Sequence, residues 1–189
     1  MDFFEELLPD RDNPYEIDLE LQASRLIGKG LDHTLELQKN ENKYKYDLSV
    51  FKYYQDGAEH EKKIIGFIEI EVSKKWNNEF PSNWKTYSFL RRKVSSYDFL
   101  DPDYEFDEGF YNDIKENGDK TIYIIFNQSL TDAFCCDIVT ISKFTKVHCE
   151  VVGIPYNDSF LRTDLQDPNV KRGLDECVDY INKFMLNNG

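Results

Sequence analysis

Residues 64–76 read IIGFIEIEVSKKW, an apolar run that carries two glutamates two positions apart and ends in lysines. Successive side chains of a β-strand point to opposite faces of the sheet. Glu69 and Glu71 are therefore predicted on one face, and Ile68, Ile70 and Val72 on the other. Neighbouring carboxylates repel each other, and glutamate is a poor strand former. The stretch predicts a strand with one core face and one solvent-facing acidic face that attracts a cation.

A second acid lies upstream in a similar setting. Residues 44–51 (YKYDLSVF) also alternate and place Asp47 on the outward face. The residues expected on the inward face are Tyr46, Leu48 and Val50. An Asp-Gly pair within residues 55–60 is typical of a turn, which predicts an antiparallel pair of strands with a long hairpin loop. This pairing sets Asp47 beside Glu69 or Glu71.

The chemistry of such an acid cluster suits a hard divalent cation. Mg²⁺ and Mn²⁺ bind oxygen ligands, keep several waters, and need only a few protein carboxylates together with substrate phosphate oxygens. A site of this kind is suited to phosphodiester hydrolysis.

An acid on one strand, followed across a hairpin by Glu-x-Glu and lysines, resembles the motif of the PD-(D/E)XK nuclease superfamily. Residues 69–76, the Phe80-Pro81 pair and residues 126–133 (FNQSLTDA) resemble a small phage or virus nuclease in particular. The resemblance covers roughly residues 15–160. It implies an α/β (α+β) fold with a restriction-endonuclease-like αββαβ core, in which helices flank a mixed central sheet.

The resemblance also implies roles for individual residues. Asp47, Glu69 and Glu71 would hold Mg²⁺ or Mn²⁺, which lowers the pKa of a bound water and neutralises charge on the phosphorane. Lys75 would orient that water and complete the catalytic set. Glu20, on a helix expected over residues 15–27, resembles the helix glutamate of many relatives and is a further candidate metal ligand. The alternative is that Glu16 and Glu20 belong to a solvated helix face.

The chain departs from the family pattern at the lysine. If Glu69 is the family acid, Glu71 stands where the lysine is expected; if Glu71 is the acid, Ser73 stands there. Lys74 or Lys75 could supply the missing charge, and only Lys75 has the correct strand parity. The proline that usually precedes the first acid is replaced by Tyr46.

The net charge of −13 argues against a polyphosphate partner, because affinity for nucleic acid depends largely on lysine and arginine. Residues 74–93, however, form a local basic and aromatic segment, where cations can follow a phosphate backbone and rings can stack on bases. Its predicted substrate-binding residues are Lys74, Trp76, Lys85, Arg91, Arg92 and Lys93. The alternative is a helix over residues 84–94 with Tyr87, Leu90 and Val94 in the core.

The remainder of the chain predicts supporting structure. Residues 98–119 are dense in carboxylates and are expected to form a solvated acidic insertion. Strands are expected over residues 121–126, 134–141 and 146–152, where they extend the sheet. Apolar residues at helical spacing predict an amphipathic helix over residues 169–186. With no second domain indicated, residues 1–189 are predicted to form a single nuclease-like domain.

Composition sets wider limits. A chain of 189 residues with 40% hydrophobic and 15% aromatic content is typical of a folded globular protein. No apolar run is long enough to span a membrane, and the N-terminus does not resemble a signal peptide, so a cytoplasmic location is predicted, in the host cytoplasm if the protein is phage-encoded. The scattered histidines and cysteines support neither a zinc site nor a catalytic thiol.

The sequence thus predicts a metal-dependent nuclease, a hydrolase acting on nucleic acid, with DNA favoured over RNA. A protein partner or a homodimer stays open. The alternative is an acidic interaction or inhibitor protein without catalytic activity: a DNA mimic, an immunity protein or a degenerate nuclease fold. Binding of a metal by Asp47, Glu69 and Glu71 together would distinguish the nuclease from the non-catalytic protein.

Overall fold

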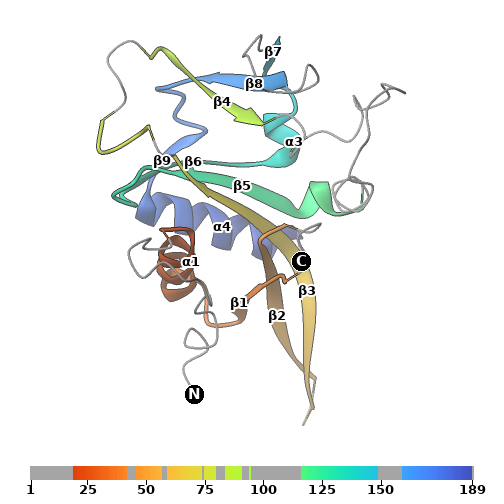
Figure 1. Cartoon of the computed structure of the whole chain (residues 1–189). Helices are drawn as coiled ribbons and strands as arrows, with labels where there is room; N and C mark the ends of the chain where they lie inside the picture. The colour runs from red at the N-terminus through yellow and green to blue at the C-terminus, as the bar shows by residue number, and fades with distance from the viewer. Residues whose placement is uncertain are drawn as a thin grey trace.

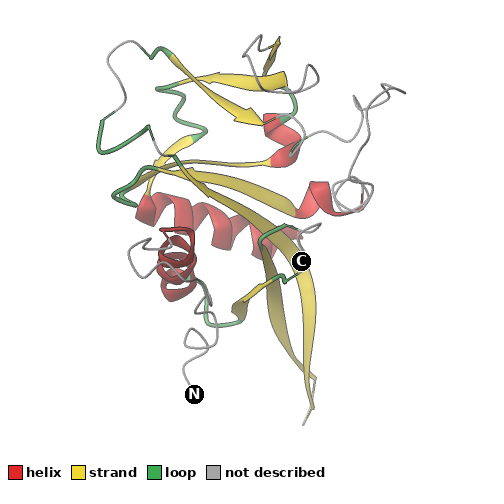
Figure 2. Ribbon diagram, viewed as in Figure 1, coloured by secondary structure: helices red, strands yellow, loops and turns green. Residues whose placement is uncertain are grey.

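The computed structural model describes residues 19–41, 46–56, 59–73, 75–79, 84–90, 94, 116–148 and 159–188. These residues form a mixed α/β arrangement in which a large sheet lies between two helices and a smaller sheet (Figure 1; Figure 2).

The large sheet has the strand order β1-β2-β3-β5-β6-β9. Its strands are β1 (Leu35–Lys39), β2 (Leu48–Asp56), β3 (Glu59–Val72), β5 (Thr121–Phe126), β6 (Asp132–Asp137) and β9 (Lys171–Gly173). β3 and β5 are parallel, whereas the other neighbours are antiparallel, so the sheet is mixed as predicted. Figure 1 shows β2 and β3 continuing past the body of the sheet as a two-stranded hairpin.

The smaller sheet has the strand order β4-β8-β7, and two long helices lie on the other side of the large sheet (Figure 2). Its strands are β4 (Thr86–Leu90), β8 (Ser159–Asp164) and β7 (Thr145–His148). The helices are α1 (Leu19–Gly30) and α4 (Leu174–Asn188), with the short elements η3 (Gly118–Lys120) and α3 (Ile138–Ile141) elsewhere.

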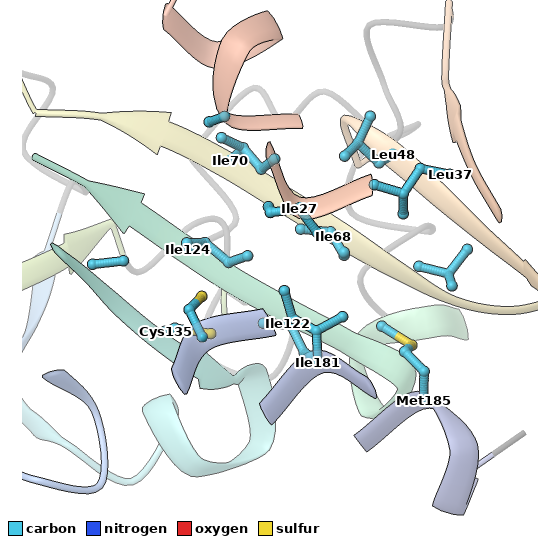
Figure 3. Packing of buried hydrophobic residues seen from close by; sticks show 14 of the residues in the cluster. Ile27, Leu37, Leu48, Ile68, Ile70, Ile122, Ile124, Cys135, Ile181 and Met185 are labelled. Atoms are coloured by element: carbon cyan, nitrogen blue, oxygen red, sulfur yellow. The ribbon is translucent and has the colours of Figure 1, made fainter. Parts of the chain in front are cut away.

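One apolar core lies between the large sheet and the two long helices, and we call it the helix-side core (Figure 3). Its buried members are Ala23, Ile27, Leu35, Leu37, Leu48, Val50, Ile65, Ile68, Ile70, Ile122, Ile124, Phe126, Leu130, Ala133, Cys135, Cys177, Ile181 and Met185. Ile68 and Ile70 are in this core and Val72 packs against it, which confirms the predicted core face of β3.

A second core, rich in aromatic rings, lies on the opposite face of the large sheet, and we call it the sheet-side core. Its buried members are Tyr46, Phe67, Trp76, Phe89, Val94, Tyr123, Ile125, Phe134, Cys136, Ile138, Ile141, Leu165 and Val170. Phe89 of β4 meets Tyr123 of β5 edge-on at 5.4 Å, and Tyr87 stacks on Phe134 at 4.6 Å. These ring pairs join the small sheet to the large one.

The sheet-side core corrects the prediction that the acidic face of β3 is solvent-facing. Glu69 is only 4% exposed, because the small sheet and the aromatic rings cover the face to which it points. Every residue of β5 is buried, as expected for a central strand covered on both faces. The alternation of apolar and acidic residues predicts a strand, but it does not predict which other elements cover the acidic face of that strand.

The hairpin differs from its prediction in two respects. β2 and β3 pair antiparallel, as predicted, but they run to Asp56 and Glu59, so the connection is two residues rather than a long loop. β2 begins at Leu48, and Tyr46 lies in the sheet-side core while Leu48 and Val50 lie in the helix-side core. The chain bends at Asp47, which breaks the alternation assumed for residues 44–51.

Other boundaries also shift. Residues 86–90 form β4, so the alternative helix over residues 84–94 is wrong. The strand predicted over 134–141 stops at Asp137, whose carboxylate accepts the Thr140 N–H at 2.8 Å and caps α3. β7 belongs to the small sheet and does not extend the large one. The C-terminal helix begins at Leu174, after β9.

Some predicted features lie outside the described residues, among them Glu16 and most of the acidic insertion, through residue 115. No helix in the described part of the chain is long and apolar enough to cross a membrane.

Gly66 allows α4 to approach β3 closely. A Cβ placed there would lie 2.5 Å from Met185 Sδ and 2.7 Å from the Lys120 carbonyl oxygen, which belongs to the main chain and cannot rotate away. We expect Gly66→Ala to lower the free energy of unfolding by about 1–3 kcal/mol, the usual cost of overpacking. Urea unfolding measures this change. Lys63→Ala, at an exposed position on the same strand, should change it by less than about 0.5 kcal/mol; an equal loss in both variants would contradict the packing account.

Candidate functional site

Asp47 lies where β2 begins and β3 continues beyond it. The last residue pair of the two strands is Leu48 with Ile68. Past this pair, the Asp47 carboxylate accepts the Ile70 N–H at 2.8 Å and so replaces a main-chain carbonyl. The Asp47 N–H makes a long hydrogen bond of 3.4 Å to Glu69 Oε2. The structure thus brings Asp47 next to Glu69, at the end of the antiparallel pair.

Asp47 also lines a small open pocket between α1 and the large sheet. The pocket is lined by Glu20, Leu21, Ser24, Lys39, Asp47, Leu48 and Ile70. Its volume is about 50 Å³, enough for a cation with a few waters. Two acidic residues and one lysine are thus among the residues that line it.

Local structure explains why these three residues line one pocket. Ala23 and Ile27 seat α1 in the helix-side core, which turns Glu20 in its first turn toward the sheet edge. Lys39 is the last residue of β1 and pairs in register with Leu48, the residue after Asp47. The pocket is built from the ends of elements whose middles are fixed by the core.

Glu69 and Glu71 point to the other face of β3. The Tyr123 hydroxyl donates a 2.7 Å hydrogen bond to Glu71 Oε1. Burial raises the pKa of Tyr123 well above its ordinary value, and the negative charges of Glu71 and Glu69 raise it further. Burial also raises the pKa of Tyr87, although a hydrogen bond with Ser73 opposes the shift. Tyrosine hydroxyls therefore line this side of the acid strand.

The other predicted site residues are more scattered. Lys75 is exposed beyond the end of β3, and Lys85 is exposed just before β4. Trp76 is 1% exposed in the sheet-side core, where its indole packs on Phe134 at 5.2 Å. A ring in this position cannot stack on a base, which corrects its predicted role. The predicted residues outside the described part of the chain are Lys74, Arg91, Arg92 and Lys93.

The acids do not form a single compact cluster. Among the described residues, no group of three or more histidines, cysteines and carboxylates lies close enough to hold a metal ion. Glu20 and Asp47 nevertheless line one pocket. Mg²⁺ typically keeps several waters and takes one or two protein carboxylates together with substrate phosphates. The donor set of the pocket fits this mode of binding.

Sequence reasoning missed Lys39 because it missed β1. The segment 35–39 (LELQK) alternates apolar and polar residues, and Leu35 and Leu37 are buried in the helix-side core. That alternation was the available signal for a strand. Its short length and its strong helix formers, leucine and glutamate, obscure the signal.

Comparisons with known proteins leave the family undetermined. No family profile matches the chain, and no curated protein matches it. The solved structure of a nuclease from a fusselovirus is similar with a TM-score of 0.46 and 15% sequence identity, over 88% of this chain and 87% of that chain. A similarity of this size establishes neither a common family nor a common activity.

The Tyr123 hydroxyl should contribute measurably to stability. Tyr123→Phe removes the donor to Glu71, and we expect a loss of about 1–2 kcal/mol at pH 7. A raised pKa in the folded state gives stability that is present below pH 10.0, the ordinary value, and is lost at higher pH. Urea unfolding should therefore show a steeper alkaline loss in the wild type than in Tyr123→Phe.

Tyr54→Phe, on the projecting hairpin, is the control for this change and should alter stability at pH 7 by less than about 0.5 kcal/mol. Equal alkaline slopes in the wild type and Tyr123→Phe would contradict the assigned cause.

Proposed function

We propose that the protein is a metal-dependent nuclease of the PD-(D/E)XK kind that hydrolyses phosphodiester bonds in nucleic acid, with DNA the favoured substrate. The observation that supports the proposal most strongly is the pocket that Glu20, Lys39 and Asp47 share at the end of the β2–β3 pair. Two acids and one lysine around a space of ionic size suit a metal ion and the phosphate that it activates.

Asp47 and Glu20 are the residues that would hold Mg²⁺ or Mn²⁺. When bound, the metal would supply a Lewis acid that lowers the pKa of a bound water and stabilises charge on the phosphate. The Ile70 N–H holds one oxygen of the Asp47 carboxylate at 2.8 Å, which limits its rotation. Glu69 contacts the Asp47 N–H from the opposite face of β3 and, with Glu71, remains a proposed further ligand.

Lys39 has a distinct role in this proposal. The two carboxylates would repel an approaching phosphodiester, and Lys39, an exposed residue that lines the same pocket, would offset part of that repulsion. Lys39 would supply a cation that the β3 motif lacks, because Glu71 or Ser73 stands there in place of a lysine. We therefore assign phosphate binding to Lys39, while Lys75 and Lys85 are exposed residues for more distant parts of the substrate.

Cleavage assays test the proposal directly. Labelled single- and double-stranded DNA and RNA are incubated with the protein in Mn²⁺, Mg²⁺ or EDTA. We expect metal-dependent cleavage that Asp47→Asn lowers by more than about 100-fold, since even groups outside the ligand shell of a metal are worth about 10- to 100-fold. Glu20→Gln should also lower it. Glu69→Gln tests whether the ligand set extends across β3.

Glu41→Gln is the matched control, because it makes the same chemical change at an exposed residue close to β1. It should leave cleavage unchanged. An absence of cleavage on all four substrates, together with a melting temperature that Mn²⁺ does not raise, would reject the proposal.

Lys39→Ala separates substrate binding from metal binding. Loss of the ammonium should weaken cleavage by about 10-fold or more, while Mn²⁺ affinity stays equal or increases because a nearby positive charge is gone. Isothermal titration with Mn²⁺ and steady-state kinetics measure the two effects. Lys29→Ala, in the exposed last turn of α1, is the control and should change neither. A parallel fall in metal affinity would contradict the role assigned to Lys39.

The second candidate function is an acidic binding protein without catalytic activity. The net charge of −13 favours it, since strong negative charge opposes association with nucleic acid. It predicts neither metal-dependent cleavage nor an effect of Asp47→Asn on metal affinity, so the same assays distinguish it from the nuclease.

A further inference from the structure

Asn40, the residue after β1, makes three hydrogen bonds around Asp47. Its main-chain N–H donates to the Asp47 carbonyl oxygen at 2.9 Å. Its side-chain Nδ2 donates to the Tyr46 carbonyl oxygen at 2.6 Å, and its Oδ1 accepts the Ser49 hydroxyl at 2.9 Å. Asn40 thus contacts the residue before the acid, the acid itself and the second residue after it.

The acid needs such support because it lies outside the regular ladder. β2 begins at Leu48, and the chain bends at Asp47, so strand pairing with β3 does not fix the Asp47 dihedral angles. A rotation of its main chain would move the carboxylate away from the Ile70 N–H and out of the pocket. The two residues that the Asn40 side chain contacts are held in place by burial, because Tyr46 is 0% exposed and Ser49 is 3% exposed.

The chemistry at this position favours an amide. The Tyr46 carbonyl can only accept, so the NH₂ group must face it and the amide oxygen must face the Ser49 hydroxyl. Aspartate would place an acceptor against the carbonyl, and alanine would leave the carbonyl without this donor. Among residues of this size, asparagine alone carries a donor and an acceptor on two separate side-chain atoms.

We infer that Asn40 is a positioning residue that holds the Asp47 carboxylate in the geometry needed to bind a divalent metal. The inference rests on the proposed function, because it concerns the same pocket. It assigns a role to a residue that would act through the main chain of Tyr46 and Asp47 and through the Ser49 hydroxyl.

Metal affinity in the absence of substrate tests the inference. Isothermal titration with Mn²⁺ should show that Asn40→Ala weakens binding by about 10- to 100-fold, as for other groups that orient a metal ligand. In an Asp47→Asn background the same change should cost less than about twofold, because the carboxylate that it positions is gone. Gln38→Ala, at an exposed position on β1, should leave the affinity unchanged.

Asn40→Asp provides a second, sharper test, and it serves if the alanine variant does not fold. The substitution keeps the size of the side chain and its acceptor for Ser49, but it adds a negative charge near the metal. Charge alone would tighten Mn²⁺ binding, whereas loss of the Tyr46 contact should weaken it.

The outcomes distinguish failure of the role assigned to Asn40 from failure of the proposed metal site. Weaker Mn²⁺ binding in both Asn40 variants, with non-additivity toward Asp47→Asn, supports the inference. If Asp47→Asn weakens binding and the Asn40 variants lower only the melting temperature in EDTA, the role of Asn40 is structural and the inference is overturned while the nuclease proposal stands. If Asp47→Asn itself leaves Mn²⁺ affinity unchanged, the proposed metal site fails and the inference fails with it.

Discussion

The pairing of β3 with β2 on one side and β5 on the other is the constraint on which the site depends. β3 is covered by the helix-side core on one face and by the sheet-side core on the other, so neither the strand nor its acids can shift without disturbing a core. The antiparallel partner, β2, begins at Leu48, one residue after Asp47. Asp47 lies just beyond the last strand pair, where its carboxylate accepts the Ile70 N–H and the residue lines the pocket beside α1.

This geometry divides the acids between two environments. Glu20 and Asp47 share a small pocket with Lys39, whereas Glu69 and Glu71 face the aromatic rings and the Tyr123 hydroxyl. Two acids and one lysine among the lining residues suit a dication bound with several waters. The strong overall negative charge makes local cations such as Lys39 more important to any approach by a polyanion.

The sequence predicted the parts of the fold that follow from periodicity. The core face of β3, the antiparallel β2–β3 pair and β5 are examples, because alternation and turn chemistry are local properties. It failed where tertiary contacts decide. The burial of Glu69 and Trp76 depends on a small sheet whose strands are distant in sequence. The roles of Lys39 and Asn40 were not predicted. Their position beside Asp47 follows from the register between β1 and β2, which the sequence of either strand alone does not reveal.

The most direct test of the central claim is a crystal of the protein soaked in MnCl₂, with anomalous diffraction used to locate the metal. We expect an anomalous peak within coordination distance of the Asp47 and Glu20 carboxylates, and its loss in Asp47→Asn. Peaks confined to other surface carboxylates, with none at this pocket, would contradict it.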